Sequence, residues 1–442
     1  MGFANRMLCH RGSTFLLVLS LVTVITSSTV RAEETFSFDA AEFEKKTWSN
    51  GGFAEIKWEH MDVRQGSALS LLNMYDDPQS DLDQLSGSLQ LNGAYTKGIA
   101  QLHWLLNATG QQDTFGWTDR ADIYESYLNI APASGVTASV GKRSYKWGKG
   151  YAWNPVGFIN RTKDPNNPEE ALEGFITSDF EMIRSFSGDL QNIALTTALL
   201  PVWQEVNEDF GAEDNLTLAA KLYLLYLNTD IDFIVYSGNS RTTRFGGDFS
   251  RNLTTNFEIH GEAAYIPEVE RVTLTEGGQR VRQSGSATSY LAGIRYLTEF
   301  DLTSIIEYYH NGLGYTEDEM SRFYQRVATG ETLWTSTGND ALLQQMLQLS
   351  AQGYSRPNPG RDYLYARFSL KEPFDILYFT PAMTTILNLE DQSFSVTPEL
   401  TYTGITNWEL QLRCSLLNGD QSSEFGEKQN SNKLELRLRY FF

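Results

Sequence analysis

The chain has 442 residues, a formal net charge of −20 and 13% aromatic residues. Such strong acidity argues against nucleic acid as a partner, although it says little about the fold. The fold must therefore be inferred from the order of apolar and polar residues along the chain.

The N-terminus has the pattern of a secretory signal peptide. Arg6 and Arg11 precede an apolar run at 15–26, and small residues follow it up to Ala32. We therefore predict a signal peptide over 1–32 and a short periplasmic segment over 33–51. The apolar run is too short for a membrane-spanning helix, which needs about 20 residues, so any membrane insertion must be by strands. Cys9 lies in the predicted signal peptide, which leaves Cys414 as the one mature thiol.

Beyond the signal peptide, apolar and polar residues alternate in segments, a pattern that places successive side chains on opposite faces of a sheet. The joins between segments alternate between short and long, as expected for periplasmic turns and extracellular loops. We predict eighteen strands, at 52–61, 87–95, 99–107, 122–130, 136–143, 180–186, 190–199, 216–227, 231–238, 243–251, 254–265, 287–297, 301–311, 362–370, 376–388, 394–403, 407–417 and 432–442.

An even number of strands puts both ends of the chain on the periplasmic side. The predicted fold class is all-β, a transmembrane antiparallel up-and-down β-barrel over 52–442 with about 18 strands, or 16 as the alternative. Such a barrel is wide enough for an aqueous channel. The longest loop, 312–360, contains an apolar pattern of helical spacing at 340–352, which predicts a short amphipathic helix that caps or plugs the outer mouth.

The basic segment 141–163 follows the fifth predicted strand and carries no acid. Folded inward, it would form a constriction in which Lys and Arg favour anions and aromatic faces suit sugar rings. Gly148 and Gly150 would let its backbone turn sharply or approach a solute closely. The alternative is that its aromatics form the extracellular girdle and its basic residues bind lipopolysaccharide phosphates. The candidate residues for solute contact in this segment are Arg143, Lys146, Trp147, Lys149, Tyr151, Trp153, Arg161 and Lys163.

Within this segment, Gly-Lys-Arg at 141–143, Trp-Gly at 147–148 and Asn-Pro at 154–155 resemble porin-like barrels of the alginate-export type and related outer-membrane families. The resemblance implies passive passage of polysaccharide or small solutes, with no catalytic role.

The last predicted strand places Lys433, Glu435, Arg437 and Arg439 toward the lumen. Arg437 and Arg439 are further pore candidates, which either form a transverse field or are neutralised by acids such as Glu409 and Glu435. The residues assigned to lipid are Leu434, Leu436, Leu438, Tyr440 and Phe442. Ending on Phe after alternating apolar residues resembles the C-terminal signature of Gram-negative outer-membrane barrels. That resemblance implies an outer-membrane location and assembly by the barrel assembly machinery.

Motifs for catalysis and metal binding are scarce. We find no Gly-x-Ser-x-Gly elbow, no His-Glu-x-x-His zinc site and no P-loop. His260 between Glu258 and Glu262 is a candidate proton-transfer or metal site, but alternating polar residues are typical of any solvated lumen wall. The acids Asp76, Asp77, Asp81 and Asp83 lack the spacing of a calcium loop and favour a solvated loop.

The sequence therefore predicts no enzyme, no cofactor and no metal. The leading hypothesis is an outer-membrane porin-like channel for small solutes, with anions or acidic saccharides as candidates. The alternatives are a barrel-anchored surface, adhesion or assembly module with little conductance and, third, a membrane hydrolase. The expected partners are outer-membrane lipid, lipopolysaccharide, the barrel assembly machinery and small solutes, and the oligomeric state is not predicted.

Overall fold

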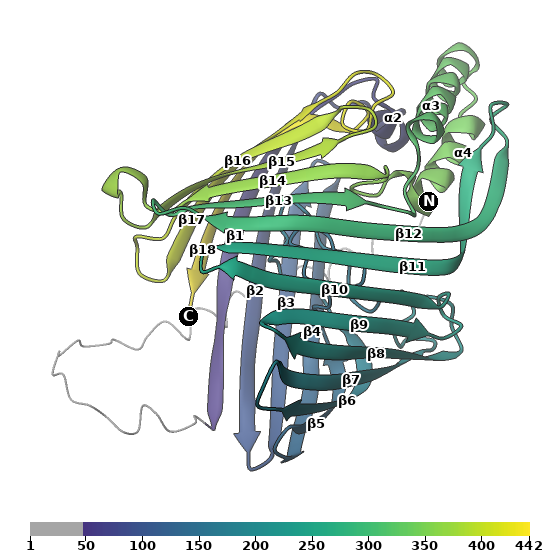
Figure 1. The fold of residues 1–442 in the computed structure, drawn as a ribbon. Coiled ribbons are helices and arrows are strands. Elements are labelled where there is room, and N and C mark those ends of the chain that lie inside the picture. Colours follow the sequence, from purple (N-terminus) through teal and green to yellow (C-terminus); the bar gives the residue numbers. More distant parts are fainter. Residues whose placement is uncertain (1–46) are drawn as a thin grey trace, which may run out of the picture.

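The computed structural model describes residues 47–442, and its strands form one closed antiparallel sheet of 18 strands (Figure 1). Each strand pairs with the next in sequence, and the first strand also pairs with the last, with Phe53 opposite Phe441. Closure leaves no unpaired sheet edge, which lipid could not satisfy. The prediction of 18 strands is confirmed and the alternative of 16 is wrong. The predicted signal peptide and most of the predicted periplasmic segment lie outside the described residues.

The strands follow the predicted order. Their bounds are β1 Trp48–Val63, β2 Asp81–Lys97, β3 Ala100–Asp113, β4 Gly116–Ala133, β5 Val136–Arg143, β6 Phe175–Ser185, β7 Leu190–Val202, β8 Asn215–Tyr226, β9 Thr229–Ser237, β10 Arg244–Thr254, β11 Phe257–Leu274, β12 Arg280–Leu297, β13 Leu302–His310, β14 Asp362–Leu370, β15 Phe379–Asn388, β16 Phe394–Tyr402, β17 Trp408–Asn418 and β18 Asn430–Phe441.

Several strands are longer than predicted. β1 begins at Trp48, so the end of the predicted periplasmic segment is strand. The region between the predicted strands 99–107 and 122–130 is a hairpin, because β3 continues to Asp113 and β4 begins at Gly116. β11 and β12 likewise continue past the predicted segments as a paired ladder up to Leu274 and Arg280. The prediction depended on apolar residues at every second position. The added strand ends lie beyond the apolar band of the barrel and lack this alternation, so the predicted strands were too short.

The two faces of β18 are as predicted. The side chains of Leu434, Leu436 and Leu438 are 36–43% exposed on the outside of the barrel, whereas Glu435 and Arg437 are 3% and 8% exposed on the inside. The outer surface is therefore an apolar band and the inner surface is polar, the arrangement of a transmembrane barrel.

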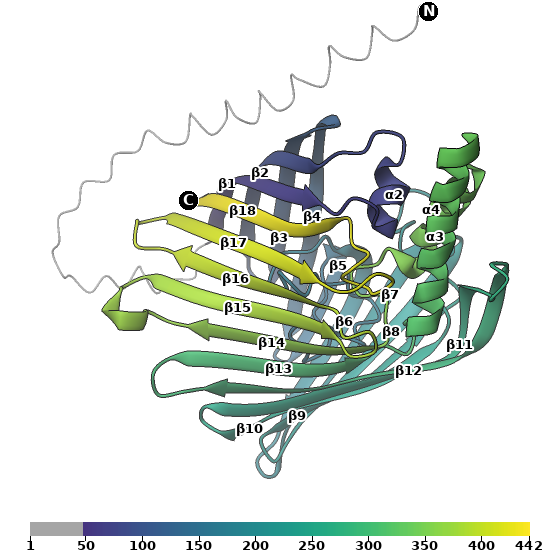
Figure 2. The same ribbon diagram turned by 90° about the horizontal axis from the view of Figure 1, so that it is seen from above.

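Helices gather at the loop end of the barrel, where β1 and β11 end (Figures 1 and 2). They are α2 Ala68–Met74, α3 Glu317–Thr337 and α4 Ala341–Leu349, followed by a π-helical turn, η2 Ser350–Tyr354; a 3-10 turn, η3 Pro373–Asp375, lies at the other end. The three α-helices pack on one another and on Leu274 of β11. The helix predicted at 340–352 is confirmed as α4 and its π-helical extension, whereas α3 was missed. Among residues 47–442, no helix is both long and apolar enough to cross a membrane.

Candidate functional site

The segment 144–174, which joins β5 to β6, folds into the barrel and reaches the opposite wall. Lys149 carries its ammonium to the carboxylates of Asp232 on β9 and Asp248 on β10, at 3.0 and 3.9 Å. The side chains of these acids are 2% and 0% exposed, so Lys149 is a loop cation inserted in a buried acidic pocket. These acids raise the pKa of Lys149 against the opposing effect of burial. The loop thus lies inside the lumen, which is the inward-folded one of the two alternatives given above.

A second attachment forms at Glu262 of β11, whose carboxylate is buried against the loop backbone. It accepts hydrogen bonds from the backbone N–H groups of Lys149 and Gly150, both at 2.5 Å, and from that of Val156 at 3.3 Å. The Asn154 side-chain amide adds a fourth, at 2.9 Å. Hydrogen bonds to a carboxylate are charge-assisted and stronger than neutral ones, so this cluster fixes the loop against the wall.

The glycines of the basic segment make this attachment possible. Gly148 has a φ of +103°, which side chains disfavour, and a Cβ there would meet Glu262 Oε1 at 2.7 Å. A Cβ on Gly150 would meet the carbonyl oxygen of Trp153 at 2.1 Å. The predicted close approach of Gly148 and Gly150 is therefore toward a wall carboxylate of the protein itself.

A third attachment forms at Glu307 of β13, which is fully buried. Its carboxylate accepts the backbone N–H groups of Tyr151 and Ala152, and its Oε1 lies 2.9 Å from His260 Nε2. The other ring nitrogen of His260 lies 3.7 Å from Glu258, so carboxylates face both nitrogens. His260 therefore belongs to the anchorage of the loop.

The two tryptophans of the basic segment are buried. Trp147 belongs to an apolar cluster with Tyr145, Val156 and Phe158. Trp153 stacks on Tyr309 of β13, with ring centroids 5.0 Å apart, and lies among further wall tyrosines. Neither ring is placed for the extracellular girdle or for solute contact, because both pack between the loop and the wall.

The other side of the lumen holds an open cavity of about 840 Å³ between the loop and the wall of β14–β18 and β1–β4. Its lining extends from Glu409 and Arg439, near the periplasmic ends of β17 and β18, to Gln111 and Thr118, near the loop-side ends of β3 and β4. The cavity therefore extends around the wall across several strands, and on β1 and β2 it is lined by residues 53–57 and 84–90.

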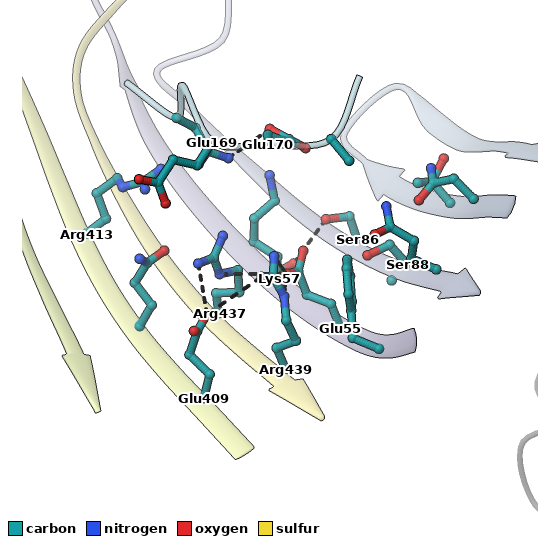
Figure 3. A pocket seen from close by; sticks show the side chains of 18 of the residues that line it. Glu55, Lys57, Ser86, Ser88, Glu169, Glu170, Glu409, Arg413, Arg437 and Arg439 are labelled. Carbon is teal, nitrogen blue, oxygen red and sulfur yellow. Dashed lines mark hydrogen bonds and ion pairs between the residues drawn. The ribbon is translucent and has the colours of Figure 1, made fainter. Parts of the chain in front are cut away.

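Basic side chains line one wall of this cavity (Figure 3). Arg437 and Arg439 are joined there by three side chains that sequence analysis did not select: Lys57, Arg367 and Arg413. Opposite them, the loop contributes Glu169 and Glu170 (Figure 3). The five basic side chains are paired with acids of the barrel wall. These ion pairs are Arg437–Glu409 at 3.1 Å, Arg439–Glu55 at 2.6 Å, Arg367–Glu399 at 3.1 Å, Arg413–Glu399 at 2.8 Å and Lys57–Glu59 at 2.8 Å.

The lining of the cavity is balanced in charge. Besides the five basic side chains above it includes Arg120, and six acids stand against the six cations: Glu55, Asp119, Glu169, Glu170, Glu399 and Glu409. The expected neutralisation of Arg437 by Glu409 is present, and Glu55 contributes a second partner at 3.6 Å. A row of guanidinium groups nonetheless faces the loop carboxylates across open space.

The remaining candidates are divided among different roles. Arg143 pairs with Asp179 at 2.7 Å, and Arg161 pairs with Asp209. Lys146 is exposed. A second cavity, of about 300 Å³, brings together five of the predicted residues: Lys146, Lys149, Tyr151, Arg161 and Lys163. Tyr151 also lines the large cavity, so it lies at the boundary between the two.

One group among residues 47–442 could offer three metal ligands, namely His60, Asp81 and Asp83, whose ligand atoms lie within 4.8 Å of one another. It lies on the outward face of β1 and β2, with His60 opposite Asp83 in the ladder. Asp81 and Asp83 are exposed, as predicted, but they lie in β2 and not in the predicted loop.

Comparison with known proteins identifies the fold. No family model and no curated protein matches the chain. The solved structure of Wzi, an Escherichia coli outer-membrane protein involved in group 1 capsule assembly and described as a carbohydrate-binding β-barrel, has a TM-score of 0.51 at 10% identity, over 88% of this chain and 83% of Wzi. OccK7 (OpdD) of Pseudomonas aeruginosa has a TM-score of 0.50 at 12% identity, over 90% and 99% of the two chains. OccAB2 of Acinetobacter baumannii has a TM-score of 0.50 at 11% identity, over 89% and 98%.

These identities are low, so the likeness is one of fold. Together with the closed sheet and its apolar outer band, it shows that the chain has the fold of a transmembrane β-barrel, which it shares with these outer-membrane proteins.

Proposed function

We propose that the protein is an outer-membrane channel for small polar solutes, with acidic saccharides as the preferred class. The observation that carries the proposal is the large cavity in the lumen, which lies between the loop and the wall strands from β14 to β4 and is lined mainly by polar and charged side chains. A polar cavity of about 840 Å³ inside a closed sheet suits the passage of a hydrated solute.

The preference for acidic saccharides depends on how the cavity is lined. The guanidinium groups of Arg413, Arg437 and Arg439 can each bind a carboxylate through paired hydrogen bonds. Between and opposite them stand side chains that exchange hydrogen bonds with hydroxyl groups, among them Gln84, Ser86, Ser88, Asn166 and Asn167. Equal numbers of cations and acids predict weak discrimination between simple salts and stronger discrimination between solutes of different shape.

Conductance in a planar lipid bilayer tests the channel. The purified barrel should give stable current steps, and liposomes containing it should swell faster in galacturonate than in an uncharged disaccharide. The double variant R437Q/R439Q should shift the reversal potential toward potassium, whereas R282Q, at an exposed position on β12, should not. A folded, heat-modifiable barrel without current would overturn the proposal.

The alternative of a barrel-anchored surface, adhesion or assembly module with little conductance is retained for that outcome, since a barrel of similar fold is described as involved in capsule assembly and as carbohydrate-binding. Lipopolysaccharide and the barrel assembly machinery stay expected partners under either function.

A further inference from the structure

The second cavity lies beside the main one, behind a partition built by the loop. Tyr151, Pro168, Glu169 and Glu170 line both cavities, so these residues lie between the two spaces. On its other side the smaller cavity, which we call the recess, is closed by the wall residues Glu258, His260, Arg295 and Ile305.

The recess differs from the main cavity in charge. Five cations line it, Lys146, Lys149, Arg161, Lys163 and Arg295, against three acids, Glu169, Glu170 and Glu258. Lys149 and Arg161 are held by acids outside the recess, Asp232 and Asp209.

The other three cations of the recess have no ion pair within 4 Å among the residues that the structure describes: Lys146, Lys163 and Arg295. Lys163 donates to the carbonyl oxygens of Gly150 and Tyr151, at 3.0 and 3.2 Å, which leaves one of its three N–H groups for another acceptor. Burial lowers the pKa of Lys163, and the nearby carboxylates of Glu262 and Glu307 offset this effect only in part. An anion in the recess would supply the charge that these cations lack.

We propose that the recess is an anion-binding subsite, which takes one carboxylate or phosphate group of a solute from the main cavity. This inference rests on the proposed function, because it assigns the subsite to solutes that enter the main cavity. The ligand class is a small organic anion of about monosaccharide size, bound through Lys146, Lys163 and Arg295.

Tyr151 stands between this subsite and the main cavity. Its backbone is fixed, since Glu307 accepts its N–H group and Lys163 donates to its carbonyl oxygen. Its ring, in contrast, is joined to the facing part of the loop by one hydrogen bond, from the phenol to Glu169 Oε1 at 3.3 Å. The ring also packs beside Tyr365 of β14, with ring centroids 6.1 Å apart, so the Tyr151 side chain forms part of the partition between the two cavities.

Calorimetric titration of the purified full-length barrel in detergent tests the subsite with three probes: galacturonate, galactose and inorganic phosphate. Galacturonate should bind more tightly than galactose, and the double variant K146Q/R295Q should weaken galacturonate binding by at least about tenfold while leaving galactose unaffected. The matched control R282Q/K371Q removes two cations at exposed positions and should leave binding unchanged. Binding of phosphate to the unaltered protein, lost in K146Q/R295Q, would extend the ligand class from carboxylates to phosphates.

Two results would overturn the subsite: no binding of either anion to the unaltered protein, or equal affinities of the unaltered protein and K146Q/R295Q. Circular dichroism and the heat-induced gel shift verify that the variant is folded. The bilayer measurement is made on the same preparations, so loss of current with retained galacturonate binding would contradict the channel and leave the subsite supported.

Discussion

The two halves of the lumen use the same residue type in opposite ways. On the wall of β9–β13, inward-facing Glu262 and Glu307 accept hydrogen bonds from backbone N–H groups of the loop, and that half is packed. On the wall of β14–β18 and β1, inward-facing Glu55, Glu399 and Glu409 pair with arginines of neighbouring strands, and that half stays open. A carboxylate on a barrel wall therefore either fixes a loop or lines a channel, depending on whether its partner comes from the loop or from the wall.

Replacing a lysine should give the largest difference in lost stability between the packed half and the open half of the lumen. K149M would leave Asp232 and Asp248 buried without their nearest cation, and we expect a loss of about 3–5 kcal/mol in the free energy of unfolding. K57M, in the open half, leaves Glu59 paired with Lys433 at 2.9 Å and should cost about 0–1 kcal/mol. Urea unfolding in lipid vesicles measures both variants.

The double variant K149M/D248N provides the check on the first prediction. It removes one uncompensated carboxylate and should recover part of the stability lost in K149M. Equal losses for K149M and K57M would contradict the assignment of Lys149 as a buried anchor.

A smaller difference in lost stability is expected when a glutamate is replaced in each half. In E262Q the amide group that replaces one carboxylate oxygen cannot accept the backbone N–H groups of the loop, and unpaired buried donors cost about 1–3 kcal/mol. E409Q removes the same charge from a solvated ion-pair network and should cost under about 1 kcal/mol. E262Q should also increase channel conductance, since the loop is released, whereas a normal conductance in E262Q would show that the loop is fixed by other contacts.

The fold was largely predictable from the sequence because the alternation of side chains repeats in every strand. Pro381 weakened the prediction for one strand, yet it lies in β15 just beyond the last residue paired with β14, Ala382, where a missing N–H group interrupts no ladder on that side. The helix α3 was missed, although Thr316 and Glu319 form a capping box and Gly338 ends the helix, signals that are visible in the sequence.

The candidate site was less predictable. Inward positions of predicted strands already contained Arg367 and Arg413, but alternation alone does not say which strands face the loop across the lumen. Trp147 and Trp153 looked like solute contacts because the local sequence is rich in glycine and basic residues. Their burial depends on Phe158, Tyr309 and other residues distant in sequence or on other strands.

The smallest expected effect concerns Tyr151, at the boundary between the two halves. Burial raises the pKa of Tyr151 to about 12, above the value of about 10 expected in the unfolded chain. The folded protein thus favours the neutral phenol. The resulting stability is fully present below pH 10 and is lost as the pH rises from about 10 to 12, where the unfolded chain releases its proton first.

Y151F should remove this part of the alkaline loss of stability and the corresponding tyrosinate absorbance change near pH 12. Y378F, in the exposed turn between β14 and β15, should retain both. An unchanged alkaline profile in Y151F would place the ring in open water, and the partition between the main cavity and the recess would then have to depend on Glu169 and Pro168.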